Sequence, residues 1–567
     1  ARLIIDPNSP RNDRTIYVIE KNAVAVREAG KWRQGPPAPA PFTGVSAGFP
    51  RAGGPLHVWA LAEGVLHSAD GGATWKRVDE GLKAARYRAI ATSLNHPEVA
   101  YVSYSGLQLD GETFFGVART SDSGRTWKTL WRESKSKSPD VDDGWVSDRF
   151  GPGWGSNPLA LGVAPTNPDV CYATDYGRTL RTTDGGKTWR AVYTRRTAAG
   201  TFTSTGLDVT TAYGVHWDPF HPTRMFISYT DISLFRSDDG GKTWDGALAQ
   251  GIPRAWRNTT YWMEFDPKVK GRVWAVMSGT HDLPRPKMWR RTEPSTYQGG
   301  VLRSEDGGLS WKTLTNGIPP TAATHILLDP QSPASARVLY VTGFGRGVFK
   351  STDGGESWTL KNEGLPGREP FAWRLTLAPD KALYLVIARR SEDGSFGSPN
   401  DGGLYRSTDG ANHWTRVPLP EGLNGPNGLA VDPRDPRRLY LASWGRRTPE
   451  GAVMGGVWLS EDAGATWRCI LDRDQHIYDV TIDSRNPDTL YACGFESSAW
   501  RSLDRGKTWQ RIRGYNFKWG HRVIPDPRNP GMIYITTFGG SVWHGPAAGD
   551  PKAVEDIVTP ELAYSQR

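Results

Sequence analysis

The segment Gly456–Ile470 reads Gly-Val-Trp-Leu-Ser-Glu-Asp-Ala-Gly-Ala-Thr-Trp-Arg-Cys-Ile, and it decides the fold. Two short apolar runs flank a polar turn that contains Asp462 and Gly464, a pattern typical of two antiparallel strands joined by a tight connection. Upstream, Gly428–Pro433 and Leu439–Trp444 are two more strand-like runs separated by turn residues. The four runs together predict one four-stranded antiparallel sheet.

Nine turns along the chain closely follow the pattern Ser/Thr-x-Asp-x-Gly-x-Thr/Ser/His-Trp, always between the third and fourth runs of a unit. Their third-position aspartates are Asp70, Asp122, Asp184, Asp239, Asp306, Asp353, Asp409, Asp462 and Asp504. Each carboxylate is expected to accept backbone N–H bonds across its turn, with glycine supplying a positive φ and tryptophan packing between neighbouring sheets. Nine copies of one residue indicate a structural role for these aspartates.

The spacing of the turns, roughly 40 to 65 residues, is in the range of β-propeller blades. A degenerate unit, Arg2–Gln34, opens the chain, and a three-stranded unit, His521–Gly545, closes it. About eleven units therefore fill residues 1–549, followed by a tail at 550–567. Because one ring usually holds four to eight blades, the sequence predicts an all-β propeller fold of four-stranded antiparallel blades, arranged as one large ring or two rings.

Composition narrows the class of protein. The 567 residues carry a formal net charge of +9 and contain no apolar run near the 18 or so residues of a membrane span. The basic residues are spread along the chain, so we expect no nucleic-acid partner. No His, Asp, Glu or Cys spacing points to a metal, and no cofactor is expected. The chain begins at Ala1 and enters a strand-like run almost at once, which favours an exported, secreted or periplasmic protein.

The repeated turn resembles the Asp-box, or BNR repeat, of several propeller families. Two further segments resemble the catalytic motif Thr/Gly-Asp-Ile-Gly-Gly of the xyloglucanases of glycoside hydrolase family 74: Tyr229-Thr-Asp-Ile-Ser-Leu and Ala173-Thr-Asp-Tyr-Gly-Arg. The resemblance implies Asp231 and Asp175 as the catalytic carboxylates. This chain departs from the family motif in two ways. Ser233 and Leu234 replace the glycines, and the two motifs fall in consecutive units, whereas that family has one in each of two propellers.

The loops opposite the repeated turns are expected to carry the function, because they are free to vary on a rigid scaffold. They are rich in aromatic residues, which stack on sugar rings, and in Arg, Lys and His, which bind carboxylate or sulfate groups. The predicted substrate contacts are Trp256, Arg257, Tyr261, His281, Arg285, Trp289, Trp444, Arg446, Trp519 and His521. This surface predicts a polysaccharide or oligosaccharide partner. Because basic residues are in excess, the partner could be an acidic glycan.

Three functions fit these loops. A glycoside hydrolase needs two carboxylates, for which Asp231 and Asp175 are first and Asp282 is the reserve acid. A polysaccharide lyase needs a base and a cation beside a uronate carboxylate, and its candidates are His216, His281, His521, Tyr261 and Arg257. A binding or assembly propeller would use the same loops without chemistry. The Asp-Ile motif favours the hydrolase.

Overall fold

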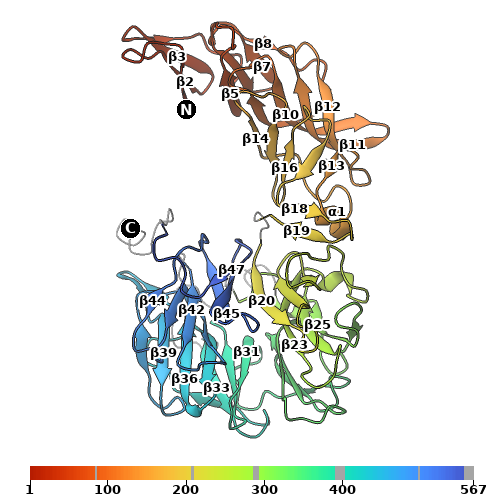
Figure 1. The fold of residues 1–567 in the computed structure, drawn as a ribbon, viewed down its shortest axis with the longest axis vertical. Coiled ribbons are helices and arrows are strands. Elements are labelled where there is room, and N and C mark those ends of the chain that lie inside the picture. Colours follow the sequence, from red (N-terminus) through yellow and green to blue (C-terminus); the bar gives the residue numbers. More distant parts are fainter. Residues whose placement is uncertain (83–85, 206–209, 285–292, 390–401, 496–498, 554–567) are drawn as a thin grey trace. The chain divides into compact units, whose positions relative to one another are not determined.

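The computed structural model describes residues 1–82, 86–205, 210–284, 293–389, 402–495 and 499–553. The chain divides into an N-terminal unit, Ala1–Asp208, and a C-terminal unit, Val209–Arg567. Both consist of small antiparallel sheets joined in series (Figure 1). The predicted all-β propeller fold of four-stranded antiparallel blades is confirmed.

The C-terminal unit contains seven blades, and the first and last of them have three described strands each. The first three blades are β20 (Ala212–Trp217), β21 (Met225–Tyr229), β22 (Leu234–Ser237); β23 (Thr259–Phe265), β24 (Val273–Ser278), β25 (Gly299–Ser304), β26 (Lys312–Thr313); and β27 (Ala322–Leu328), β28 (Leu339–Phe344), β29 (Gly347–Ser351), β30 (Thr359–Leu360). The other four are β31 (Ala372–Leu377), β32 (Leu383–Ile387), β33 (Gly403–Ser407), β34 (Thr415–Val417); β35 (Pro426–Asp432), β36 (Asp435–Ser443), β39 (Gly456–Ser460), β40 (Arg468–Leu471); β41 (Ile477–Ile482), β42 (Leu490–Gly494), β43 (Ala499–Ser502), β44 (Gln510–Arg511); and β45 (Gly520–Pro525), β46 (Met532–Thr537), β47 (Val542–Pro546). The connections add the hairpin β37 (Arg446–Thr448) and β38 (Gly451–Val453) and two short 3-10 helices, Arg254–Trp256 and Pro294–Thr296.

These seven blades close into a ring. Strand β20 of the first blade packs against β45 and β46 of the last, and Figure 1 shows the yellow β20 beside the blue strands of the last blade. Across this junction His521 Nδ1 donates to the Ala212 carbonyl at 3.1 Å. Closure gives every blade two neighbours, so both faces of each sheet are covered.

The repeated turns have the bonds that their sequence predicts. In the turn of the second blade, Asp306 Oδ1 accepts the backbone N–H of Ser310 at 2.9 Å, while Ser304 Oγ accepts that of Gly308 at 2.8 Å. The Asp409 copy carries Ala411 at the glycine position with φ +70°, and its amide still reaches Ser407 Oγ at 3.0 Å. The carboxylates therefore stabilise turns.

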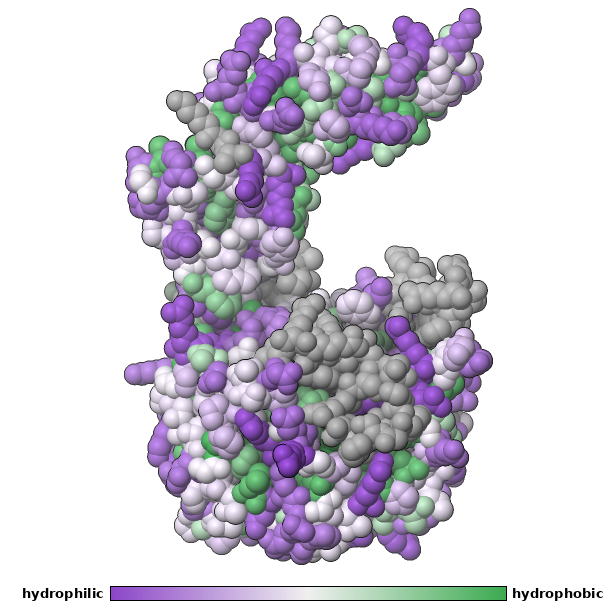
Figure 2. Space-filling view, turned by 180° about the vertical axis from the view of Figure 1, so that it is seen from behind, coloured by the Kyte–Doolittle hydropathy of each residue, from purple (hydrophilic) through white to green (hydrophobic). Residues whose placement is uncertain are grey.

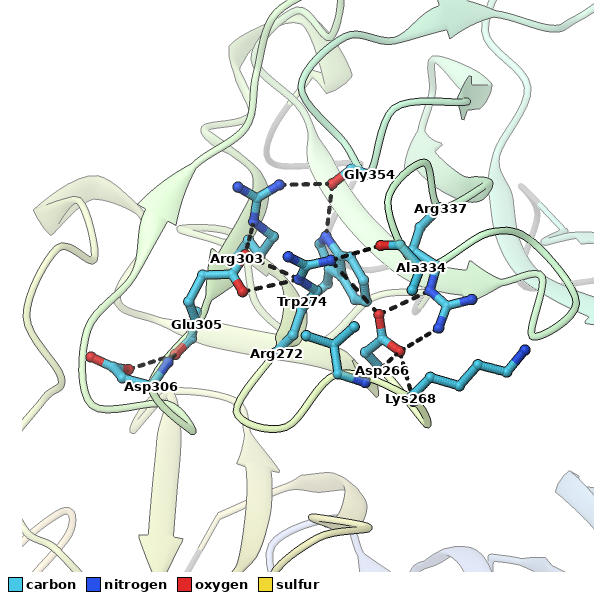
Figure 3. Close-up of polar contacts among 12 residues, drawn as sticks. Asp266, Lys268, Arg272, Trp274, Arg303, Glu305, Asp306, Ala334, Arg337 and Gly354 are labelled. Carbon is cyan, nitrogen blue, oxygen red and sulfur yellow. Dashed lines mark hydrogen bonds and ion pairs between the residues drawn. The ribbon is translucent and has the colours of Figure 1, made fainter.

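Neighbouring blades are joined by side chains at the face that carries these turns (Figure 3). Asp266, which directly follows β23 of the second blade, pairs with Arg337 of the third blade, and both side chains are fully buried. Trp274 Nε1 donates to the Gly354 carbonyl at 3.1 Å, again from the second blade to the third. These contacts link the second blade to the third in addition to their apolar packing.

The N-terminal unit contains four sheets. They are β1 (Arg2–Ile5), β2 (Ile16–Glu20), β3 (Ala23–Glu28), β4 (Lys31–Gln34); β5 (Gly44–Gly48), β6 (His57–Leu61), β7 (Val65–Ser68), β8 (Lys76–Arg77); β9 (Arg86–Thr92), β10 (Ala100–Leu109), β11 (Glu112–Thr120), β12 (Lys128–Glu133); and β14 (Ala160–Val163), β15 (Cys171–Thr174), β16 (Thr179–Thr182), β17 (Trp189–Ala191). The fourth sheet gains β13 (Val141–Asp142), which runs parallel to β17. A helix, α1 (Trp145–Phe150), and a hairpin, β18 (Thr194–Arg196) and β19 (Phe202–Ser204), complete the unit.

The described surface of each unit is mostly polar, with small separate apolar patches (Figure 2). Among the described residues, no helix is long and apolar enough to cross a membrane.

Candidate functional site

Blade connectivity places one set of loops on one face of the ring in the C-terminal unit. The second strand of a blade runs antiparallel to the first, so the loop leaving it lies at the end where the first strand begins. Asp231 follows the second strand β21, and His281 follows β24. Thr210 and Asn258 precede the first strands β20 and β23. These four residues therefore meet on the face opposite the repeated turns.

Asp231 is the centre of this group. Its Oδ2 accepts the Thr210 hydroxyl at 3.0 Å, and its Oδ1 accepts the Asn258 amide at 3.4 Å. His281 Nδ1 lies 3.3 Å from the same Oδ1. The Asp231 side chain is nevertheless 48% exposed. The carboxylate is thus oriented by three side chains and open to solvent.

The backbone around Asp231 is unusual. Asp231 and Ser233 have φ of +62° and +64°, a left-handed region that glycine adopts easily and serine does not. Ser233 is fully buried, and its N–H donates to the Asn258 carbonyl at 3.0 Å. Ser233 stands where the resembling motif has its first glycine, so this position keeps a glycine-like conformation. Strained backbone of this kind often occurs where a side chain must be held for function.

Electrostatics favour the ionised form of Asp231. Partial burial raises the pKa of the carboxyl group, but the contacts with His281, Thr210 and Asn258 outweigh burial and hold the pKa below its ordinary value. Asp231 is therefore ionised at neutral pH and suits a base or nucleophile better than an acid. Asp282, the next residue after His281, also has a positive φ of +60° and is partly exposed.

Asp175 is in a different environment. It lies in the N-terminal unit, whereas Asp231 lies in the C-terminal unit, so the two motifs belong to separate compact units. The Asp175 side chain is 1% exposed and pairs with Arg178 at 2.8 Å. Its oxygens also accept the backbone N–H groups of Ser156, Gly177 and Arg178. This carboxylate organises a turn and a buried ion pair, and it presents no free surface to a polysaccharide.

A second group on the loop face consists of aromatic side chains from the last three blades. Trp444 contacts His476 and Phe495 with ring centroids 4.4 and 4.5 Å apart. Phe495 also contacts Trp519 at 5.9 Å, and Trp519 is 41% exposed with the Lys518 ammonium 5.3 Å from its ring. Such a cationic aromatic surface suits stacking on a sugar ring. We call Trp444, His476, Phe495 and Trp519 the aromatic group.

Two members of the aromatic group, His476 and Phe495, are absent from the predicted contacts. Both occupy loop positions equivalent to those that were selected: His476 precedes a first strand and Phe495 follows a second strand. A search by blade position would have found them, whereas a search for clusters of aromatic and basic residues did not.

Three of the predicted contacts belong to the core. Trp256 is 9% exposed and packs on Gly300, Tyr261 is 2% exposed and donates to the Thr280 carbonyl at 2.7 Å, and His521 is 1% exposed. Tyr261 and His521 are extra residues at β-bulges of the innermost strands, which turn their side chains inward. Burial leaves them no surface for a ligand, which corrects the prediction for these residues.

The remaining predicted contacts have mixed positions. Arg257 is exposed and its Nε donates to the Ile252 carbonyl, while Arg446 is partly exposed and its Nε donates to the Gly422 carbonyl at 3.2 Å. Arg285 and Trp289 lie outside the described residues.

Most of the residues predicted as the base of a lyase are buried. Burial raises the pKa of Tyr261 well above its ordinary value, and burial lowers the pKa of His216 to about 3. With His521 also buried, His281 is the one candidate base that keeps solvent access among these four described residues. Within the described ranges, no group of three or more His, Cys, Asp or Glu residues is arranged to hold a metal ion.

Comparison with known proteins finds relatives among polysaccharide hydrolases. No family model matches the sequence. The chain is 26% identical over 268 residues to an oligoxyloglucan-reducing end-specific xyloglucanase of Emericella nidulans, covering 44% of this chain and 26% of that protein. It is 28% identical over 204 residues to the xyloglucanase Xgh74A of Acetivibrio thermocellus, covering 30% of this chain and 22% of that protein. The chain thus spans about a quarter of the length of these relatives.

A solved structure also resembles most of the chain. The GH74 xyloglucanase of Xanthomonas campestris superposes with a TM-score of 0.57 at 19% identity, covering 96% of this chain and 74% of that one. At this identity the match establishes the shared propeller fold. The sequence matches independently confirm the resemblance to family 74 xyloglucanases.

Proposed function

We propose that this chain is the propeller part of a secreted or periplasmic glycoside hydrolase that cleaves a polysaccharide. The observation that carries the proposal is Asp231: an exposed, ionised carboxylate on a left-handed turn, oriented by His281 and Asn258 on the loop face of a propeller. The sequence similarity to xyloglucanases supports the same class of reaction.

In this mechanism Asp231 is the base or nucleophile. Its low pKa keeps the carboxylate charged near neutral pH, and His281 fixes the orientation of Oδ1. A glycosidase also needs a group that protonates the leaving oxygen. We assign this role to Asp282, a partly exposed carboxyl group on the neighbouring loop of the same face. Asp175 is left out because its carboxylate is buried against Arg178.

The aromatic group supplies the binding surface of the proposal. Its exposed member Trp519 offers a flat face for a sugar ring, and Lys518 and Arg446 add positive charge beside it. Xyloglucan is the first substrate to test, since the relatives are xyloglucanases. A uronate-containing glycan is the second, because the cations would attract its carboxylates.

The test is to incubate the chain with xyloglucan and a panel of neutral and acidic polysaccharides and to measure both new reducing ends and unsaturated uronate absorbance. We expect reducing ends without absorbance. Asp231→Asn is expected to lower kcat at least a hundredfold, because loss of a catalytic carboxylate removes a base or nucleophile. Asp282→Asn is expected to lower kcat by a comparable factor.

Asp435→Asn is the matched control, since Asp435 is a partly exposed carboxylate at the start of β36, next to the turn from β35 and on the opposite face. It should leave the rate unchanged. Full activity of Asp231→Asn would remove Asp231 from the mechanism. Absorbance with reducing ends would identify a lyase, and no product from any polysaccharide would favour a binding propeller.

A further inference from the structure

The innermost strands of the C-terminal unit share one irregularity. Each of the seven carries an extra residue close to its start, where its register with the next strand shifts by one. The extra residues are Tyr213, Tyr261, Thr324, Trp373, Asn427, Tyr478 and His521, all at most 6% exposed. A bulge of this kind redirects the side chains around it, and seven at one level build a layer around the ring axis.

The extra residues close the axis toward the loop face. Tyr213 of the first blade contacts Trp373 of the fourth with ring centroids 6.3 Å apart, and Tyr261 of the second blade contacts Trp373 at 6.0 Å. Blades that are not neighbours can touch in this way only across the axis. The aromatic side chains therefore form a plug, which separates the axis below it from the proposed carbohydrate face.

Directly below the plug lies a polar layer. The residues that follow the seven bulges are Gly214, Trp262, His325, Arg374, Gly428, Asp479 and Arg522. The two glycines give room to their neighbours: a Cβ on Gly428 would lie 2.1 Å from Asp479 Oδ1. We call these seven residues the axial layer.

The axial layer contains two guanidinium groups and one carboxylate. Arg374 Nη1 lies 3.1 Å from Asp479 Oδ1, and Arg522 pairs with the other oxygen of Asp479. All three side chains are about nine-tenths buried or more, at 9%, 8% and 11% exposed. Two positive charges thus share one negative charge, and one positive charge has no counter-charge among the described residues of the layer. A buried charge without compensation is strongly unfavourable.

His325 adds a hydrogen-bonding group that no described protein atom satisfies. The residue is 7% exposed, its ring stacks on Trp262 with centroids 5.2 Å apart, and its buried Nδ1 has no hydrogen-bond partner among the described residues. Burial lowers the pKa of His325 most, and the neighbouring Arg374, Arg522 and His216 lower it further, so the imidazole is neutral. A neutral imidazole can donate from Nδ1.

The layer is reached from the face that carries the repeated turns. Two residues further along the inner strands, Glu264, Leu327 and Thr376 are partly exposed, so solvent enters from that side. Glu264 is the next carboxyl group on this route. Burial raises the pKa of Glu264 to about 8, so it is mostly neutral at pH 7 and does not balance the arginines.

We propose that the axial layer binds one small monovalent anion, a halide or a short carboxylate, between the guanidinium groups of Arg374 and Arg522 and Nδ1 of His325. The anion balances the second arginine and accepts the free imidazole N–H. Charge-assisted hydrogen bonds of this type are shorter and stronger than those between neutral groups. The site is independent of the proposed hydrolase, since the aromatic plug separates it from the loop face.

The test uses the whole chain in two measurements. Crystals soaked in sodium bromide should give an anomalous peak between Arg374, Arg522 and His325. In solution, the thermal unfolding midpoint should rise to a plateau with chloride, and separately with acetate, when each replaces gluconate at constant sodium concentration. Arg374→Met should weaken the apparent affinity at least tenfold. His325→Phe keeps the stacked ring, folds, and should weaken the affinity about threefold.

Arg406→Met is the control, because Arg406 is a partly exposed arginine on an outer strand of the same blade as Arg374. It should respond to anions as the wild type does. The proposal is overturned if no bromide peak lies in the layer, or if Arg374→Met and His325→Phe keep the wild-type anion response. A peak that appears only in Glu264→Gln would show that ionised Glu264 balances the layer and would also overturn it. Preference for sulfate over bromide and acetate would contradict a monovalent ligand.

Discussion

The two units contain the same kind of blade but complete it differently. In the C-terminal unit β20 packs against the last blade, so the ring is closed. In the N-terminal unit the first and fourth sheets each have an exposed face. Leu3 and Trp32 of the first sheet are 64% and 56% exposed, and Tyr172 of the fourth is 43% exposed. The repeat therefore determines a blade, while closure determines whether that blade is buried on both sides.

The inner strands differ as well. All seven in the C-terminal unit carry the same bulge. In the N-terminal unit β9 also shifts its register, whereas β1, β5 and β14 pair without a shift. A complete layer of bulges is thus described in the closed ring and not in the N-terminal unit. The N-terminal unit instead uses a buried ion network at its fourth sheet, where Arg178 pairs with Glu133 at 2.8 Å and with Asp143 at 3.0 Å.

The first prediction is that replacing Arg178 causes the largest loss of stability, and that this loss is confined to the N-terminal unit. The fully buried Arg178 guanidinium pairs with Glu133, Asp143 and Asp175, and Arg178→Met would leave three carboxyl groups buried together without a cation. We expect the N-terminal unit to lose at least about 3 to 5 kcal/mol. Hydrogen exchange should show faster exchange in β14–β17 and unchanged exchange in the C-terminal blades.

Arg33→Met is the control for Arg178, because Arg33 pairs with Glu28 on the surface, with side chains 71% and 58% exposed. Its loss should cost about 0 to 1 kcal/mol. If both variants lose the same free energy of unfolding, the ion network of Arg178 does not stabilise the N-terminal unit.

The second prediction compares one tryptophan position in the two units. Trp414 ends a repeated turn in the C-terminal unit, is 1% exposed and donates to the Lys361 carbonyl at 2.9 Å. Trp32 ends the degenerate turn of the first sheet and is 56% exposed. Trp414→Ala should cost about 3 to 5 kcal/mol in chemical denaturation, whereas Trp32→Ala should cost less than about 0.5 kcal/mol. Equal losses would mean that the first sheet is covered in solution.

Much of the fold could be predicted from the sequence because each blade is held by local bonds. The turn at Asp306, for example, needs only residues four positions apart. Ring closure depends on contacts such as that between His521 and Ala212, which lie 309 residues apart. No local pattern encodes such a pair, so the number of rings stayed open.

The candidate site was harder to predict for two physical reasons. One bulge in β23 and one in β45 place Tyr261 and His521, which were predicted to lie in binding loops, in the core. Asp175 follows a strand and a threonine as Asp231 does, but its carboxylate forms a buried ion pair with Arg178, three residues later. Asp231 has no such arginine and remains exposed.

The third prediction concerns what the units share, the repeated turns. Burial raises the pKa of Asp184 and of Asp239, but hydrogen bonds from Thr188 and Thr243 outweigh it and lower both pKa values. Groups with a depressed folded pKa stabilise the protein above the unfolded pKa, near 3.9, and this stability is lost as the pH falls below it. Asp184→Ala and Asp239→Ala should each cost about 1 kcal/mol at pH 7.

These two deficits should shrink as the pH falls below about 4, since the wild-type carboxylates then become protonated. Denaturation at several pH values measures this. The turn is the same in both units. A loss of stability confined to one unit would therefore show that ring closure, and not the turn alone, determines how much the aspartate stabilises the protein.

The smallest expected effect is a gain of stability in the N-terminal unit. Burial and the nearby Glu133 charge raise the pKa of Asp143, and together they outweigh its bonds to Ser147 and Arg178. A raised folded pKa contributes stability at low pH that is lost as the pH rises through it. Asp143→Asn removes this loss while keeping an oxygen for the Ser147 N–H, so it should stabilise the unit by about 0.5 to 1 kcal/mol at pH 7 and by nothing near pH 4.

Asp148→Asn serves as the control for Asp143, since Asp148 pairs with Arg196 at the surface and is 33% exposed. It should change stability little at either pH. A loss at pH 7 in Asp143→Asn comparable to that of Arg178→Met would mean that Arg178 needs all three carboxylates ionised. The stability of the N-terminal unit would then depend on all three ion pairs of Arg178. A gain of stability would show that two carboxylates are sufficient to pair with Arg178, and that the charge of Asp143 destabilises the fourth sheet.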